Sequence, residues 1–155
     1  MANVEPIPSD YPRVIPYLSI DGAAEAIRFY CDVLGATERV RMDAPGGKVG
    51  HAELDVDGSV IMLADSFPDM SPPTPRALGG TPVTLMVYVA DVDAVHARAL
   101  AAGATEVSPV QDQFYGDRSG QFEDPFGHRW HVASHVEDVS PEEMERRMAA
   151  QQGGG

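Results

Sequence analysis

The stretch GQFEDPFGHRWHVASH, residues 120–135, decides the fold that we predict for this chain. It is typical of a β-hairpin, in which a turn over residues 124–127 (DPFG) joins an approach strand to a return strand over residues 128–133. Proline at the second turn position and glycine at the fourth are both favoured in type I turns. Because side chains alternate along a strand, Trp130 and His131 point to opposite faces. One face is thus suited to a core, and the other presents polar groups.

The composition is that of a soluble globular protein and narrows the choice of partners. The 155 residues are 43% hydrophobic and 23% charged, enough for one domain or two small modules. A net charge of −13 disfavours nucleic acid as a partner, because phosphate binding requires clustered Lys and Arg. No apolar run approaches the roughly 20 residues of a membrane span, and the first residues lack the apolar segment of a signal peptide. We therefore expect no membrane partner. The single Cys31 cannot form an intrachain disulfide, which fits a reducing compartment, so we expect a cytoplasmic protein.

The first half of the chain predicts one βαβββ module over residues 13–66, after an irregular lead-in over residues 1–12. Alternation along the middle strand puts His51 and Glu53 on one face and apolar residues on the other. The dipeptide at residues 57–58 (DG) is a strong hairpin signal. The predicted elements are a strand over 14–20, a helix over 22–34, and strands over 37–42, 49–56 and 59–64.

The second half predicts another βαβββ module over residues 82–136. Residues 67–81 are rich in Pro and Gly and follow neither period, so we interpret them as a linker. After the module, residues 137–150 should contain a C-terminal helix, with a capping box and proline beginning at Ser140, and residues 151–155 should be disordered. The predicted elements of the module are a strand over 82–89, a helix over 92–102, a short strand near 106–107, a loop with Pro109, and the hairpin.

The two halves repeat one another. Residues 35–38 and 103–106 are the same tetrapeptide, GATE, and an offset of 69 residues aligns Met62 with His131. Each module can bury its helix against one sheet face and leave the opposite face free for a shared cavity. We therefore predict an α+β fold of two tandem βαβββ modules forming a partly open eight-stranded barrel, plus a C-terminal helix.

Several of these features resemble the vicinal oxygen chelate superfamily, which includes glyoxalases, bleomycin-resistance proteins and dioxygenases. The resemblance rests on the paired modules and on residues 27–30 (IRFY) and 123–128 (EDPFGH). Residues 51–53 (HAE) and 115–118 (YGDR) look most like the PhnB-like, glyoxalase-like branch. The resemblance spans about residues 13 to 140 and implies the fold and a homodimer. It does not name a reaction, because this fold hosts many chemistries.

Metal-dependent members of the superfamily take one ligand from the first strand of each module and one from the last. Carried onto this chain, these positions are Ile15 (or Val14), Met62, Thr84 and His131. Of these side chains, His131 alone binds a divalent first-row metal well, whereas a catalytic site needs about three protein ligands. We therefore expect neither the usual metal site nor another cofactor. An alternative is a metal-dependent lyase or dioxygenase with a rearranged site formed by His51, Glu53, Glu123 and His131.

The favoured interpretation is a protein that binds a small molecule in a cavity between the modules. Arg129 would hold a carboxylate or phosphate, and Glu53 or Glu123 an amine; a purely structural pairing of His51 and Glu53 with Arg129 stays open. A weaker alternative is metal-free proton transfer, with His131 or His51 as the catalytic residue. The expected ligand-binding residues are Tyr17, His51, Glu53, Met62, Thr84, Met86, Tyr88, Tyr115, Arg118, Glu123, Arg129 and His131.

Overall fold

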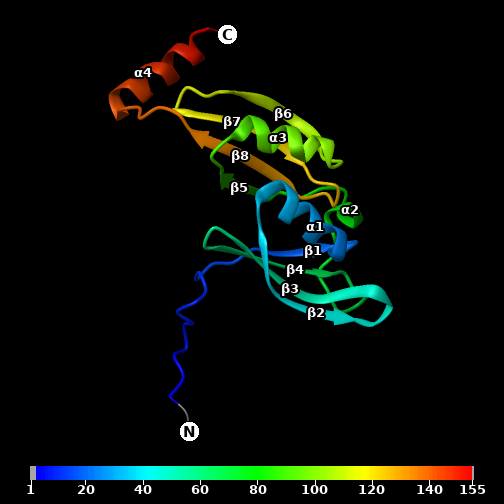
Figure 1. Cartoon of the computed structure of the whole chain (residues 1–155). Coiled ribbons are helices and arrows are strands. Elements are labelled where there is room, and N and C mark those ends of the chain that lie inside the picture. Colours follow the sequence, from blue (N-terminus) through cyan, green and yellow to red (C-terminus); the bar gives the residue numbers. More distant parts are fainter. Residues whose placement is uncertain (1–2, 155) are drawn as a thin grey trace. The chain divides into compact units, whose positions relative to one another are not determined.

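The computed structural model describes residues 3–154, and in that range the chain divides into two compact units. The first unit extends to Gly79 and the second begins at Gly80. Each unit contains a four-stranded mixed sheet with a helix lying across one side (Figure 1). These units are the two predicted βαβββ modules, and the α+β fold with a C-terminal helix is confirmed.

The sheet of the first unit has the strand order β1-β4-β3-β2, with β1 parallel to β4 and the other pairs antiparallel. Helix α1 packs its apolar side, including Ile27, Tyr30 and Val33, against this sheet. The elements of the unit are β1 (Tyr17–Ile20), α1 (Ala23–Leu34), β2 (Thr37–Ala44), the short helix η1 (Pro45–Gly47), β3 (Lys48–Val56), β4 (Ser59–Asp65) and α2 (Pro75–Leu78).

Asp65, at the end of β4, holds the start of α1 in place. The N-cap residue of this helix is Gly22, which has no side chain to accept a hydrogen bond from the first turn. Asp65 Oδ1 instead accepts from the backbone N–H groups of Gly22 and Ala23, both at 3.0 Å, and Oδ2 accepts from Val49 N at 2.7 Å. Burial raises the pKa of Asp65, but the three donors outweigh burial and leave this pKa below its ordinary value. One carboxylate thus joins the helix, β3 and β4.

The proline-rich segment after β4 folds back onto the first unit. Ser19 Oγ donates to the backbone oxygen of Pro72 at 2.6 Å, and Thr74 Oγ1 donates to Asp21 Oδ2 at 3.2 Å. Thr74 is also the N-cap of α2, because its hydroxyl accepts from Ala77 N. The residues that we interpreted as a linker are therefore anchored to β1 and to the turn that follows it.

The sheet of the second unit has the strand order β5-β8-β7-β6. Strand β6 is longer than predicted and contains Pro109, which we expected in a loop. Proline is tolerated there because β6 is an edge strand whose pairing with β7 is irregular around Ser108. The elements are β5 (Thr84–Tyr88), α3 (Val92–Ala101), β6 (Thr105–Asp112), β7 (Asp117–Glu123), β8 (Arg129–His135) and α4 (Pro141–Gln152).

Helix α4 extends two residues beyond the predicted end at residue 150. The part of the expected disordered tail at residue 155, like residues 1–2 of the lead-in, lies outside the described residues. Arg147 anchors the helix, since its guanidinium donates to Glu137 and Glu143 and to the backbone oxygen of Phe114.

Strand registers reproduce the internal repeat. Tyr17 pairs with Met62 in the first sheet, and Met86 pairs with His131 at the corresponding place in the second. The repeat extends to the side chain that accepts hydrogen bonds from the start of each helix, because Ser134 occupies in the second unit the position of Asp65 in the first. Its Oγ accepts from Val92 N at the start of α3, at 3.1 Å, and donates to Val89 O.

The hairpin between β7 and β8 is organised by the buried carboxylate of Asp124. Asp124 Oδ1 accepts from the backbone N–H groups of Phe126 and His128, and Oδ2 accepts from Trp130 Nε1 at 2.9 Å. A fourth bond, Gly127 N to Asp124 O at 3.1 Å, closes the turn. Trp130 is 2% exposed, which confirms the prediction that its face belongs to the core. The Asp124 carboxylate therefore connects the turn to Trp130 in the core.

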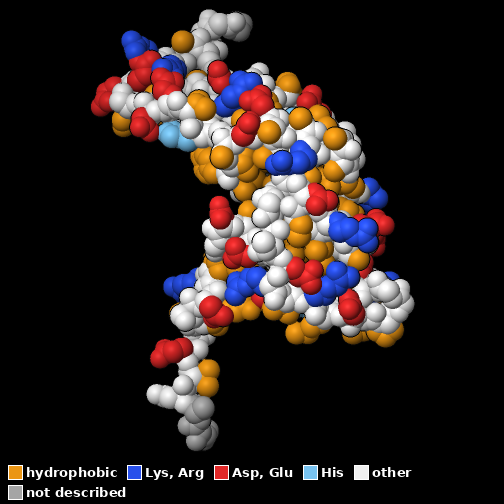
Figure 2. All heavy atoms as spheres, viewed as in Figure 1, with side chains coloured by type: hydrophobic (Ala, Val, Ile, Leu, Met, Phe, Trp, Pro, Cys, Tyr) orange, Lys and Arg blue, Asp and Glu red, His pale blue; other side chains and the backbone are white. Residues whose placement is uncertain are grey.

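The surface carries charges of both signs. On the face seen in Figure 2, Lys and Arg side chains are interspersed with Asp and Glu side chains over both units. Among the described residues, no helix has the length and apolar character required to cross a membrane.

Candidate functional site

Four of the predicted site residues lie together on the helix-free face of the first sheet, the side opposite α1. Tyr17 on β1 is opposite Met62 on β4, and Met62 is in turn opposite Glu53 on β3. His51 lies two residues before Glu53 and shares its face, as predicted from strand alternation. Tyr17 is 55% exposed, whereas Glu53 is only 6% exposed.

A chain of hydrogen bonds connects the polar members of this group. Tyr17 Oη lies 2.7 Å from His51 Nδ1, and His51 Nε2 lies 2.8 Å from Glu53 Oε2. The other oxygen, Glu53 Oε1, accepts from Tyr11 Oη at 2.6 Å. The bonds from His51 and Tyr11 lower the pKa of Glu53 despite its burial. Glu53 is therefore ionised at neutral pH.

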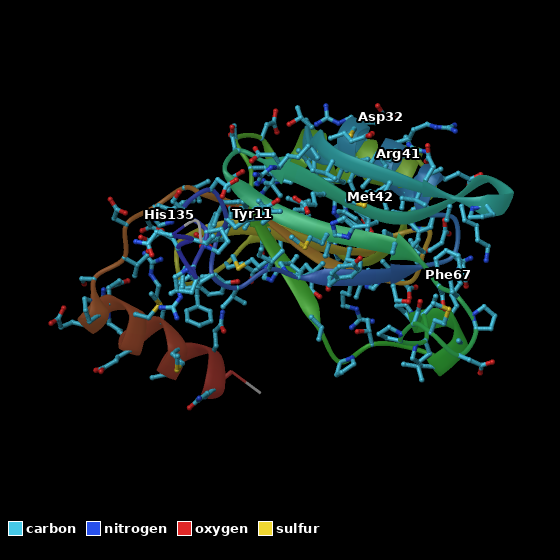
Figure 3. All side chains as sticks on the ribbon, turned by 90° about the horizontal axis from the view of Figure 1, so that it is seen from below. Tyr11, Asp32, Arg41, Met42, Phe67 and His135 are labelled. Atoms are coloured by element: carbon cyan, nitrogen blue, oxygen red, sulfur yellow. The ribbon has the colours of Figure 1, made fainter. Side chains whose placement is uncertain are left out.

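Tyr11 is a member of this group that the sequence did not indicate. It belongs to the irregular lead-in and reaches the sheet from the N-terminal segment (Figure 3). The Arg39 guanidinium lies 4.6 Å from the centre of the Tyr11 ring, and Arg39 also donates to Asp10 O. No local pattern marks residue 11, because its role depends on β2 and β3 side chains far along the chain.

The helix-free face of the second sheet carries another group of predicted residues. Thr84 is opposite Arg129 and Arg129 is opposite Glu123, while Met86 is opposite His131 and His131 is opposite Gln121. Within residues 3–154 the side chains of Gln121, Glu123, Arg129 and His131 make no hydrogen bond or ion pair. Met86 is 50% exposed. These groups are thus available to a ligand.

Tyr88, at the end of β5, belongs to a separate hydrogen-bonded network. Its hydroxyl donates to Asp117 Oδ2 at 2.8 Å, and this bond raises the pKa of Tyr88. His135, labelled in Figure 3, lies between Asp117 Oδ1 at 2.9 Å and Asp138 Oδ1 at 2.7 Å. Bonds to Asp117 and then to Asp138 raise the pKa of His135. Sequence reasoning missed Asp117 and His135 as partners. Asp117 begins β7 and His135 ends β8, and the antiparallel pairing of the two strands brings them together.

Two predicted residues do not join the groups on the helix-free faces. Arg118 lies on the helix side of β7, where it forms ion pairs with Asp93 at 2.8 Å and Asp112 at 3.1 Å. Tyr115 lies in the turn before β7, with its ring 5.2 Å from that of Phe114. Both residues therefore lie apart from the predicted residues of those two groups.

The side chains present do not fit the metal site usual for metal-dependent members of the superfamily implied by the resemblance. In the part of the chain that the structure describes, no three His, Cys, Asp or Glu side chains are arranged to hold a metal ion. Both ring nitrogens of His51 are used in hydrogen bonds, to Tyr17 and to Glu53, so neither is open to a metal in this arrangement. His131 has Met86 and Gln121 as its cross-strand neighbours, and neither is a strong ligand for a first-row metal.

Comparison with known proteins identifies the class of protein. The model of the Glyoxalase/Bleomycin resistance protein/Dioxygenase superfamily matches residues 16–132. The chain therefore belongs to this superfamily, as the sequence resemblance indicated.

The chain has relatives in sequence and similar proteins among solved structures. Protein Mb0911c of Mycobacterium bovis is 45% identical over 143 residues, which cover 90% of this chain and 94% of that protein. The crystal structure of TioX from Micromonospora sp. ML1 is 29% identical, with a TM-score of 0.63 over 81% of this chain and 99% of TioX. The PhnB protein from Bacillus cereus has a TM-score of 0.63 over 79% of this chain and 99% of its own, and at 19% identity this likeness concerns the fold alone.

Proposed function

We propose that the protein binds a small organic molecule on the helix-free face of the second sheet, without a metal ion. The observation that carries this proposal is the group of unpaired polar side chains on β7 and β8 beside the exposed Met86. Unpaired polar side chains do not by themselves mark a ligand site. A few such side chains beside apolar surface, however, are typical of one. Membership of a superfamily that contains bleomycin-resistance proteins supports the proposal.

The charges on this face favour a zwitterionic ligand with an apolar body. Arg129 is a planar donor suited to a carboxylate, and Glu123, directly opposite on β7, is suited to an amine. No ion pair within 4.0 Å joins the two side chains to each other, so both charges are available. His131 and Gln121, one pair further along the strands, can donate or accept additional hydrogen bonds.

Titration of ¹⁵N-labelled protein with phenylalanine, phenylacetate and phenethylamine tests this proposal. We expect chemical-shift changes in β5, β7 and β8, largest with the zwitterion. Arg129→Gln should abolish the response to phenylacetate and Glu123→Gln the response to phenethylamine. Arg28→Gln, which changes an exposed arginine on α1 in the first unit, is the matched control and should alter neither. Shift changes confined to other elements, or none with any of the three compounds, would reject the proposal.

We also propose that the protein forms a homodimer, as the family resemblance implies. Exposed apolar side chains outside the proposed ligand face, including Val136 at 57% and Met148 at 45% exposure, support an association surface. Sedimentation equilibrium tests it, and a single species with the 16.6 kDa mass of one chain would contradict it.

A further inference from the structure

The hydrogen bonds on the first sheet have a defined direction. An ionised carboxylate can only accept, so His51 Nε2 must carry the hydrogen of its bond to Glu53. In the neutral imidazole, Nδ1 is then an acceptor, and the Tyr17 hydroxyl donates to it over 2.7 Å. The order is hydroxyl, imidazole, carboxylate, which is the order in which a nucleophile, its base and the group that orients the base occur in acyl-transfer sites.

The exposed fractions of Tyr17, His51 and Glu53 favour a reaction at the Tyr17 hydroxyl. Tyr17 is 55% exposed and the His51 side chain 23% exposed, whereas Glu53 is 6% exposed. Glu53 is covered by Tyr11, which is itself held by Arg39. The orienting carboxylate is thus held by two hydrogen bonds and shielded, whereas the tyrosine is the most exposed member of the group.

We propose that Tyr17 is a nucleophile that accepts an acyl group from an activated ester, with His51 as its general base and Glu53 as the positioning residue. Tyr17 Oη forms a bond to the carbonyl carbon, the ester C–O bond breaks, and the leaving group departs as the alkoxide or phenolate. The Tyr17 proton moves to His51 Nδ1, and Glu53 stabilises the resulting imidazolium. His51 then gives this proton to the departing oxygen, so the products are O-acyl tyrosine, the released alcohol or phenol, and a neutral imidazole.

The proposed reaction of Tyr17 does not depend on ionisation of its phenol before the ester binds. Burial, followed by the charge of Glu53, raises the pKa of Tyr17, so the free phenolate is scarce at neutral pH. Reaction therefore depends on proton removal by His51 within the step itself. A tyrosine without an imidazole partner should instead react only as it ionises in alkaline solution.

The protein contains its own comparison residue. Tyr88 is 60% exposed, close to the value for Tyr17, but its hydroxyl donates to the carboxylate of Asp117 and not to an imidazole. Treatment of the full chain with p-nitrophenyl acetate at neutral pH, followed by peptide mass spectrometry, measures acetylation of both tyrosines in one sample. We expect Tyr17 to be acetylated preferentially, and equal or greater acetylation of Tyr88 would overturn the proposal.

Variants and NMR spectra distinguish a role of His51 and Glu53 in the reaction from a purely structural role. His51→Gln should reduce the rate of Tyr17 acetylation on the order of 100-fold, the usual contribution of a general base, and leave Tyr88 unchanged. Glu53→Gln should lower the same rate and move the hydrogen of His51 from Nε2 to Nδ1, which ¹⁵N chemical shifts detect without any reaction. In the wild type those shifts should show a bare Nδ1. A protonated Nδ1 at neutral pH, or acetylation of Tyr17 unaffected by His51→Gln, would refute the assignment.

Discussion

Replacing Asp65 by alanine should lower the free energy of unfolding of the first unit by about 4 kcal/mol. The side chain is buried and accepts three backbone hydrogen bonds, from Gly22, Ala23 and Val49. A hydrogen bond to a charged group contributes about 1.5–3 kcal/mol, and loss of a helix cap costs about 0.5–2 kcal/mol. These contributions overlap at one side chain and do not add in full, which gives the value above.

Urea denaturation followed by circular dichroism measures this change. Asp65→Asn retains the volume and one acceptor oxygen, so its cost should be intermediate, about 2 kcal/mol. Asp43→Ala is the matched surface control, because the Asp43 side chain is 75% exposed and, within residues 3–154, its one ion pair is with Arg41. Its effect should stay within about 0.5 kcal/mol.

Acidification provides an independent check on the mechanism. The pKa of Asp65 is lowered by folding, so its stabilising contribution is present above the ordinary value of 3.8 and is lost as the pH falls through the folded-state pKa. The gap between the wild type and Asp65→Asn should therefore narrow as the pH falls below 3.8. A cost below about 1 kcal/mol for Asp65→Ala, or a gap that does not change with pH, would refute the reasoning.

Three further predictions concern the second unit and the absence of a metal. His135→Gln should be destabilising below pH 6.5, because hydrogen bonds to two carboxylates raise the pKa of His135 in the folded state. This contribution is complete below the ordinary pKa and is lost as the pH rises through the raised one, so urea midpoints should converge in alkaline buffer; a gap that widens with pH would contradict it. Gly120→Ala should cost about 1–3 kcal/mol in urea denaturation, since overpacking a core has that cost. Its new Cβ would lie 2.9 Å from Val110 Cγ2 and 3.0 Å from His96 Nδ1, whereas Gly50→Ala, with its nearest contact at 3.5 Å, should be tolerated and serves as the control. Elemental analysis of protein purified without a histidine tag should find well under one metal equivalent, and a stoichiometric first-row metal would reject the metal-free proposal.

Local patterns were sufficient for most of the elements and for the faces of the strands. The turn at residues 124–127 and the alternation after it correctly placed Trp130 in the core, because hydrophobic periodicity and turn chemistry act over a few neighbouring residues. The repeat then related the modules, and the pairing of Met86 with His131 matches that of Tyr17 with Met62. Pro109 was misassigned because proline is excluded from the middle of a sheet but not from an edge, and strand order is a tertiary property.

The partners of the polar residues were decided by the tertiary structure. Strand alternation predicted that His51 and Glu53 share a face, but not that Tyr11 would cover the carboxylate or that Tyr17 would donate to the imidazole. Arg118 was predicted at a ligand site, and ion pairs with α3 and β6 hold it on the other face. The sequence by itself determined the two modules and their buried faces, since both follow from local residue type. Which polar groups are satisfied and which are free depends on contacts between residues far apart in the chain, so folding alone decides where chemistry is possible.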